Sequence, residues 1–323
     1  MSPLAAALTP LETRRDVVLH LAVRAEELGY DEFLLAEGWG HDAAVLLAEV
    51  ATRTSRIRIG TGVLNVWGRS PASLAMLATS LDAVSGGRFT LGLGAGSPQL
   101  AEGLHDVAFR EPVARLGAVT RQVRALLDGA RLAPSAPDRQ RPLRLAVRPG
   151  ARVPIRLAAL GPHAVRLAGE LADGWSPFLL PRSALKAGIG LLDEGAARAG
   201  RPPGGTLVGP CVPVAVSEAG AYWWVAFYLT SMGPLYRDTL RRLGFGAAVD
   251  AVLAAGPDAP VPAAARVLLD ELTLHGDTAG AALDRWYGAG AQLPALTLPP
   301  HLPLDELDRL LTELAPGNRE KPS

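Results

Sequence analysis

The stretch that decides the fold is residues 55–97, SRIRIGTGVLNVWGRSPASLAMLATSLDAVSGGRFTLGLGAGS. Its first part, 57–63, is a short apolar run closed by glycine, which is typical of a buried parallel strand. Ser70-Pro71 then supplies a helix cap and a proline at the first helical position, and Ser-Gly-Gly at 85–87 ends the helix. A second strand follows at 88–94. Strand, helix and strand joined by short loops predict a parallel sheet covered by helices.

The same alternation continues on both sides of this unit. A weak strand at 3–8 brings the expected number to eight, which predicts one (β/α)₈ TIM-barrel domain over 1–323; a doubly wound open sheet is the alternative. The other expected strands are 32–36, 155–159, 174–177, 207–216 and 293–298, and the other expected helices are 14–28, 42–54, 162–172, 185–199 and 304–314. Two segments interrupt the pattern. Residues 129–154 are expected to be an irregular loop, and 218–288 a mostly helical insertion before the last strand, broken near 233–234 and over 257–262.

Composition narrows the range of partners. The chain has 323 residues and a formal net charge of zero, and no basic block or acidic tail stands out, so nucleic acid and membrane surfaces are not expected partners. No apolar stretch reaches the roughly 18 residues that span a bilayer, and no signal peptide is expected. Cys211 is the single cysteine, which excludes an intramolecular disulfide and a cysteine-based metal cluster. We expect a cytoplasmic protein without a metal.

Function is expected where the strands end, because ligands of parallel α/β folds meet the carboxyl ends of the strands. The segments that follow the strands are 37–42, 62–69, 95–99, 160–162 and 178–182. They hold glycines, tryptophans and few titratable groups, which suits a flat aromatic ligand better than a hydrated metal.

Three ordered motifs carry a family resemblance: AEELGYDEFLLAEGWGHDA at 25–43, the stretch 54–109 that contains the opening segment, and VPIRLAALGPHAVRLAGELADGW at 153–175. Together they resemble the luciferase-like monooxygenase family, closest to its branch that uses the deazaflavin coenzyme F420. The resemblance covers about 11–128 and 153–250, and it implies a TIM barrel that exchanges a hydride with a hydrophobic small-molecule substrate. Two alternatives stay open: an FMN-dependent monooxygenase supplied by a separate reductase, and a barrel that has lost redox chemistry and acts as a binding protein or cofactor-independent catalyst.

The resemblance also implies cofactor contacts. In this family the bond matching Gly62-Val63 is a non-prolyl cis peptide that presses against the back of the cofactor ring, with Leu64 and Ser97 beside it. The amides near Leu160-Gly161, at the start of a helix, match the place where relatives hold the cofactor phosphate. Arg182 is expected to add a positive charge there.

The acid–base group is less well defined. Relatives that oxidise alcohols or sugars have an Asp-His pair after the second strand and a glutamate after the fourth, but this chain has Glu37-Gly38 and Ser97. Glu37 and His41 are therefore catalytic candidates, with a rim hydrogen bond and a structural role as their alternatives. Glu102 and His105, three residues apart on an expected helix, either border the substrate or fasten the loop.

Three tryptophans follow or end predicted strands: Trp39, Trp67 and Trp175. They either form the wall of a hydrophobic substrate pocket or fill the upper core. The aromatic segment near Trp223-Trp224 is expected to pack in the core, and the helices around 221–245 are expected to form a homodimer contact.

Overall fold

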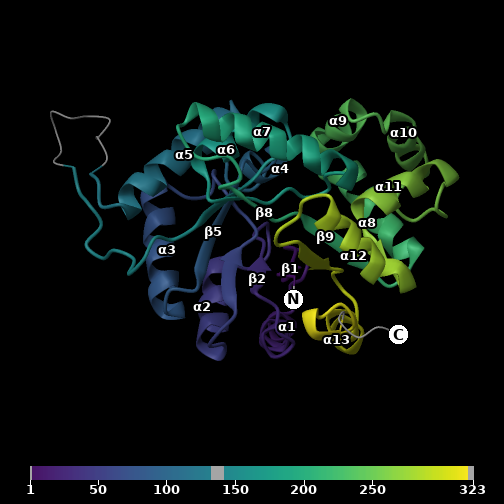
Figure 1. Cartoon of the computed structure of the whole chain (residues 1–323), viewed down its shortest axis with the longest axis horizontal. Coiled ribbons are helices and arrows are strands. Elements are labelled where there is room, and N and C mark those ends of the chain that lie inside the picture. Colours follow the sequence, from purple (N-terminus) through teal and green to yellow (C-terminus); the bar gives the residue numbers. More distant parts are fainter. Residues whose placement is uncertain (1, 132–141, 319–323) are drawn as a thin grey trace.

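The computed structural model describes residues 2–131 and 142–318. Its strands pair only in parallel, in the order β10-β9-β11-β1-β2-β3-β5-β6-β7-β8, with β4 beside β5. The strands are β1 Ala5–Leu8, β2 Glu32–Leu35, β3 Arg58–Thr61, β4 Leu64–Asn65, β5 Phe89–Gly94, β6 Ile155–Ala158, β7 Gly174–Trp175, β8 Leu207–Val208, β9 Cys211–Ala215, β10 Leu274–His275 and β11 Ala295–Leu298. Figure 1 shows helices wrapped around this curled sheet.

The seventh strand of the barrel consists of two pieces, β8 and β9, and these two pieces close the sheet. β8 pairs with β7 and β9 pairs with β11, and the chain joins β8 to β9 directly through Gly209-Pro210. A parallel bridge between Phe178 and Cys211 completes the seam. The expected single strand 207–216 is therefore wrong in one detail: it is broken at 209–210, because Pro210 has no N–H to donate to the ladder. The result is an eight-position barrel rather than an open sheet.

Most helices begin and end where local signals predicted. Asp42 accepts hydrogen bonds from the amides of Ala44 and Val45, Ser70 caps α3, and Gly86 ends α3 in the left-handed region at φ 67°. The helices are α1 Arg15–Glu27, α2 Ala43–Arg53, α3 Pro71–Ser85, α4 Pro98–Ala101, α5 Pro112–Leu127, α6 Pro162–Leu171, α7 Leu185–Arg198, α8 Glu218–Ser231, α9 Pro234–Arg242, α10 Gly246–Ala255, α11 Arg266–Leu272, α12 Ala279–Gly288 and α13 Leu304–Glu313. The expected loop 129–154 falls partly outside the described residues, and 142–154 contains no helix or strand.

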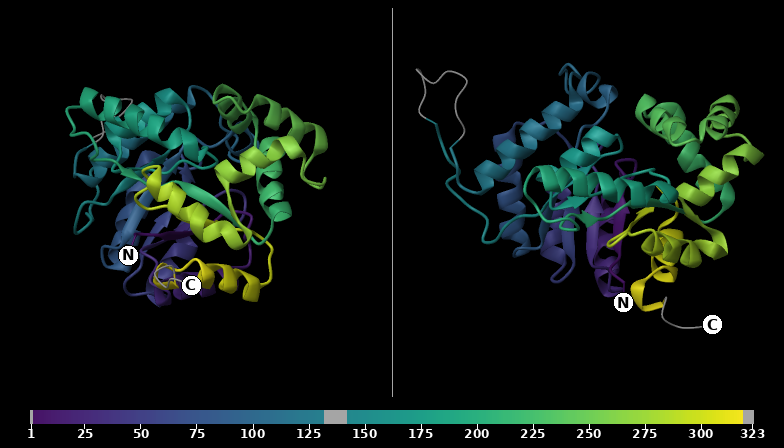
Figure 2. Two further views of the ribbon diagram at one scale, coloured as in Figure 1. Left: turned by 45° about the vertical axis from the view of Figure 1, so that its right-hand side comes forward. Right: turned by 45° about the horizontal axis from the view of Figure 1, so that its top comes forward.

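The insertion between β9 and β11 contains the helices α8 to α11, followed by the short strand β10. The helical insertion was predicted from the sequence, but β10 was not. Trp224 anchors it to the barrel by donating its indole N–H to the Val214 carbonyl, at 3.1 Å. Buried residues of α8, α9, α10 and α11 form a hydrophobic cluster of their own. The two views of Figure 2 show these helices gathered on one side of the barrel.

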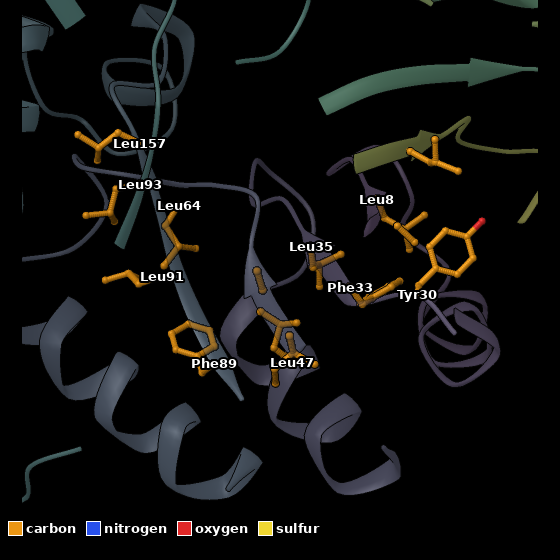
Figure 3. Packing of buried hydrophobic residues seen from close by; sticks show 14 of the residues in the cluster. Leu8, Tyr30, Phe33, Leu35, Leu47, Leu64, Phe89, Leu91, Leu93 and Leu157 are labelled. Carbon is orange, nitrogen blue, oxygen red and sulfur yellow. The ribbon is translucent and has the colours of Figure 1, made fainter. Parts of the chain in front are cut away.

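The main core lies between the strands and their surrounding helices. Side chains such as Phe33, Leu91 and Leu157 point outward from the strands into this layer, as Figure 3 shows. The barrel interior is different: its walls carry small residues such as Ala5 and Ala295, where TIM barrels usually have bulky aliphatic side chains. Long charged side chains fill the lower part of the interior, at the amino ends of the strands. In the described residues, no helix is long and apolar enough to cross a bilayer.

A buried ion pair crosses the lower interior. Arg156 of β6 meets the fully buried Glu32 of β2 through Nη1 and Oε2, 2.5 Å apart. Arg58 lies 4.0 Å from the same carboxylate and hydrogen-bonds to Thr90. Because these residues stand at the amino ends of their strands, the opposite, carboxyl end of the barrel is free to form a site.

Candidate active site

The bond between Gly62 and Val63 is cis, as the family resemblance implied. The backbone bulges at this bond, and two backbone hydrogen bonds to the end of β2 hold the bulge in place. The Gly62 amide donates to the Leu35 carbonyl at 2.9 Å, and the Val63 carbonyl accepts from the Glu37 amide at 3.2 Å. It stands at the carboxyl end of β3, facing the neighbouring strand β5. We call the Gly62-Val63 bulge and the two β5 glycines below it, Gly92 and Gly94, the shelf.

The glycines of the shelf are required by space. A Cβ on Gly94 would lie 2.7 Å from Val63 Cγ2, and one on Gly92 would lie 2.0 Å from the Thr61 carbonyl oxygen. Only glycine at both positions lets the valine lie flat against the strand. The expected role of Leu64 needs correction at the side chain, which is fully buried in the main core (Figure 3). Only its backbone can face a ligand.

An asparagine that the sequence pattern did not single out organises the rim next to the shelf. The Asn65 side-chain oxygen accepts from the amides of Trp67 and Gly68, each at 2.9 Å. Its nitrogen lies 3.2 Å from Nε2 of His105, whose ring lies against Gly68. A Cβ on Gly68 would come within 2.6 Å of that ring. Asn65 therefore fixes the partly exposed imidazole of His105 on the rim.

His105 and Glu102 do not share a helix face, so that expectation is wrong. The helix α4 ends at Ala101, and the chain continues as turns through His105. Glu102 instead accepts a hydrogen bond from the Phe109 amide at 3.0 Å and fastens the loop, which was its alternative role. Ser97 caps α4 by accepting from the Leu100 amide.

The carboxylate of Glu37 is fully engaged in hydrogen bonds at the rim of the barrel. Arg69 forms a bidentate ion pair with it, and Nη2 of Arg69 also reaches Asp42 at 2.7 Å. The second carboxylate oxygen of Glu37 accepts from the Ala43 amide at 3.1 Å. The hydrogen bond from Arg69 to Glu37 raises the pKa of the guanidinium. These donors already occupy the carboxylate, so the geometry favours the rim role for Glu37 over that of a free base.

The neighbouring His41 and Trp39 lie at the protein surface. His41 hydrogen-bonds to the Thr13 carbonyl through Nε2, at 3.0 Å, which fits its structural alternative. The Trp39 ring is half exposed and remains a candidate wall of a substrate pocket.

The other two tryptophans are buried. Trp175 is fully buried and points away from the barrel interior, against Gly188 of α7, where an added Cβ would lie 2.3 Å from the ring. It therefore belongs to the core and is not a substrate wall. Trp67 is 5% exposed; its indole N–H donates to the Ala95 carbonyl at 2.6 Å, and Arg115 covers its face at 4.6 Å. Trp67 supports the rim from below.

A third part of the site is the start of α6. Gly161 is the cap residue and Pro162 the first helical residue, and no side chain caps the free amides of this turn. Arg242 of α9, which the sequence pattern missed, donates to the Leu160 carbonyl at 3.4 Å. Arg182 is placed differently from expectation: it pairs with Glu271 at 3.0 Å. The cation beside this helix start is Arg242.

Asn65 and Arg242, the two site residues that the sequence analysis missed, have only weak signals in the local sequence. Asn65 lies within the quoted strand-end segment, and an asparagine three residues after a glycine at a strand end could have marked it. Nothing near Arg242 in the sequence connects it to Leu160, because the contact spans 82 residues.

Comparison with known proteins agrees with this geometry. The family model for luciferase-like monooxygenases matches residues 4–291. The chain belongs to the luciferase-like monooxygenase family. Among curated proteins, a Mycobacterium tuberculosis protein that bears the name of a coenzyme F420-dependent oxidoreductase is 35% identical over 283 residues, covering 78% of this chain and 80% of that protein.

Solved structures place this luciferase-like chain in the same fold. The coenzyme F420-dependent tetrahydromethanopterin reductase of Methanopyrus kandleri has a TM-score of 0.77 at 19% identity, covering 98% of this chain and 99% of that one. The oxygenating constituent of 3,6-diketocamphane monooxygenase of Pseudomonas putida, in complex with FMN, has a TM-score of 0.67 at 18% identity, covering 98% and 99%. At these identities the likeness shows the fold alone.

Proposed function

We propose that this protein is a coenzyme F420-dependent oxidoreductase that exchanges a hydride with an apolar organic substrate. The shelf carries the proposal, because Val63, packed against the two glycines of β5, presents an apolar face for a flat ring at the mouth of the barrel. The mycobacterial relative, whose name states F420 dependence, supports the choice of cofactor.

The described residues fit such a cofactor at two points. The shelf offers the apolar side chain of Val63, seated on the two glycines of β5. The uncapped start of α6, with Arg242 beside it, offers backbone amides and a positive charge for a phosphate. When bound, the deazaflavin supplies the hydride chemistry at C5 of its ring. Val63 would back the ring, and the amides that follow Gly161 would hold the phosphate.

The protein's own proton chemistry is assigned to His105. The Asn65 oxygen is occupied by two backbone amides, so the Asn65 NH₂ group faces His105 and donates to Nε2. Nε2 is then an acceptor, and the imidazole proton resides on Nδ1. This hydrogen bond holds the imidazole of His105 in one orientation at the rim, which suits a group that orients or protonates an oxygen of the substrate.

A second candidate is an FMN-dependent monooxygenase that receives reduced flavin from a separate reductase. Glu37, at the position where F420-dependent relatives have the aspartate of their Asp-His pair, is tied to Arg69. The apolar face of Val63 would suit either tricyclic ring, and structural neighbours include an FMN complex.

A titration separates these candidates. The purified protein is titrated with F420 and, separately, with FMN, and the fluorescence of each cofactor is followed. We expect micromolar binding of F420 and at least tenfold weaker binding of FMN. Tight FMN binding without F420 binding would replace the proposal with the monooxygenase. A folded sample that binds neither would favour the barrel that has lost redox chemistry.

A further inference from the structure

Three aromatic rings meet beside the carboxyl end of β7. Phe178, which follows β7 and bridges to Cys211, lies 4.8 Å from Tyr228 of α8 and 6.2 Å from Tyr236 of α9, measured between ring centroids. The two tyrosine rings are 5.4 Å apart and perpendicular. We call Tyr228 and Tyr236 the phenol pair.

The helix that carries Tyr236 spans the mouth of the barrel. Just before α9, a Cβ on Gly233 would lie 3.4 Å from the side chain of Gln99, in the loop after β5. At its other end, Arg242 hydrogen-bonds to the Leu160 carbonyl in the loop after β6. Both loops belong to the face on which the shelf stands. Tyr236 therefore lies over that mouth.

Both phenol rings contact Phe178, which bridges to Cys211, and Cys211 packs against the interior residues Ala5 and Ala295. A negative charge on Cys211 would raise the pKa of each phenol. Burial is the largest cause that raises these pKa values, and it keeps both groups protonated as O–H donors at neutral pH. Within 2–131 and 142–318 neither phenol oxygen has a hydrogen-bond partner, although Tyr228 is only 6% exposed.

A separate observation points to the same place. The Thr297 hydroxyl of β11 is buried and lacks a partner among the described residues. Its strand register sets it beside Ala7 and Pro213, one interior step above Cys211. Buried hydroxyls in native proteins are nearly always paired with protein, water or ligand. The interior next to Cys211 therefore offers a hydrogen-bonding group whose partner the described residues do not supply.

We propose that the phenol pair binds an oxygen atom of the substrate, and that the substrate is an uncharged ketone or alcohol with an apolar ring. This inference rests on the redox function proposed above. The donors are neutral hydroxyls, and the interior cation Arg156 is paired with Glu32, which favours an uncharged substrate oxygen over a carboxylate or phosphate at the phenol pair. The edges and faces of Phe178 and the phenol rings suit an apolar body.

Equilibrium dialysis with three probes tests the proposal: acetophenone, its hydrocarbon counterpart ethylbenzene, and the anion benzoate. Each is measured on the free protein and on protein loaded with F420, for the wild type, Tyr228→Phe, Tyr236→Phe and the double variant. Tyr222→Phe is the matched control, because this hydroxyl on the same helix donates to the Gly256 carbonyl at 2.8 Å. Circular dichroism establishes that each variant is folded.

We expect each Phe substitution to weaken acetophenone binding about three- to tenfold, since one neutral hydrogen bond is lost each time. Ethylbenzene binding should change less than twofold, and Tyr222→Phe should change neither. In infrared difference spectra, the ¹³C=O band of bound acetophenone should lie at lower wavenumber in the wild type than in the double variant.

Equal losses for acetophenone and ethylbenzene, an unmoved carbonyl band, preferred binding of benzoate, or no acetophenone binding by the wild type would each overturn the inference. The two proposals fail separately. A wild type that does not bind F420 refutes the redox function, and the dialysis of free protein still decides the role of the phenols.

Discussion

Gly94→Ala is the sharpest perturbation of the shelf. The new Cβ would lie 2.7 Å from Val63 Cγ2, whereas its next neighbours, Ala158 Cβ at 3.6 Å and Val63 Cβ at 3.9 Å, are at ordinary distances. Carbon atoms pack at about 3.5–4.0 Å. One methyl group of Val63 must therefore move by about 1 Å, and nothing else has to move.

Overpacking of this kind costs about 1–3 kcal/mol. If the shelf holds the cofactor ring, a displaced Val63 should weaken F420 binding about fivefold or more, because 1.4 kcal/mol corresponds to tenfold. Val63→Ala removes the clashing methyl. The substitution Gly94→Ala should then cost almost nothing in the Val63→Ala background, which makes a coupling of about 1–3 kcal/mol in the double-mutant cycle.

Two assays follow the cycle: urea denaturation for stability and fluorescence titration for F420 affinity. Gly190→Ala is the control, since an added Cβ on this exposed residue of α7 meets nothing within 4 Å. Equal costs of Gly94→Ala in both backgrounds would refute the steric reasoning. A loss of stability with unchanged F420 affinity would refute the assignment of the shelf to the cofactor.

Two further predictions concern stability. Arg156→Leu should cost about 3–5 kcal/mol in urea denaturation, because it removes the hydrogen-bonded partner of the buried Glu32 carboxylate and leaves only Arg58, 4.0 Å away; Glu32→Leu in the same chain should restore much of the loss. Burial raises the pKa of Asp173, but hydrogen bonds from the Ile155 amide and from Arg152 outweigh it, so the pKa is lowered. The stability that Asp173 contributes is complete above about pH 4, its unfolded value, and is lost as the pH falls through the lower folded value. Asp173→Asn should therefore destabilise the protein at pH 7, with a deficit that shrinks in denaturation curves taken at progressively lower pH.

The fold was predictable where one residue governs its own neighbourhood. The cap at Asp42, the Ser70-Pro71 start and the left-handed Gly86 each act within a turn, and they divided the chain correctly into strands and helices. Elements that depend on distant pairing were not predicted. The two-residue strands β4 and β10 exist because β5 and β9 lie beside them, and no two-residue segment has a periodicity of its own.

The candidate site follows the same division. The shelf was predictable because its motif is contiguous, from the strand end at Gly62 to the β5 glycines. Glu102 and His105 were wrongly set on one helix face, because spacing of three residues has that meaning only while a helix continues, and α4 ends at Ala101. The true partner of His105 is Asn65, 40 residues away.

The insertion is therefore where prediction from sequence is weakest, and it carries the phenol pair that we propose to bind the substrate. The barrel supplies the shelf and the uncapped start of α6 from its own strand ends. The phenol pair and Arg242 come instead from α8 and α9, more than 50 residues after β6, and they reach the mouth only because α9 lies across the loops after β5 and β6. Substitutions of Tyr228 and Tyr236 are therefore expected to alter the surface above the shelf without disturbing the closed ladder of strands below it. A substitution of Arg242 would also change the start of α6, so the same helix α9 connects the proposed substrate site to the proposed phosphate site.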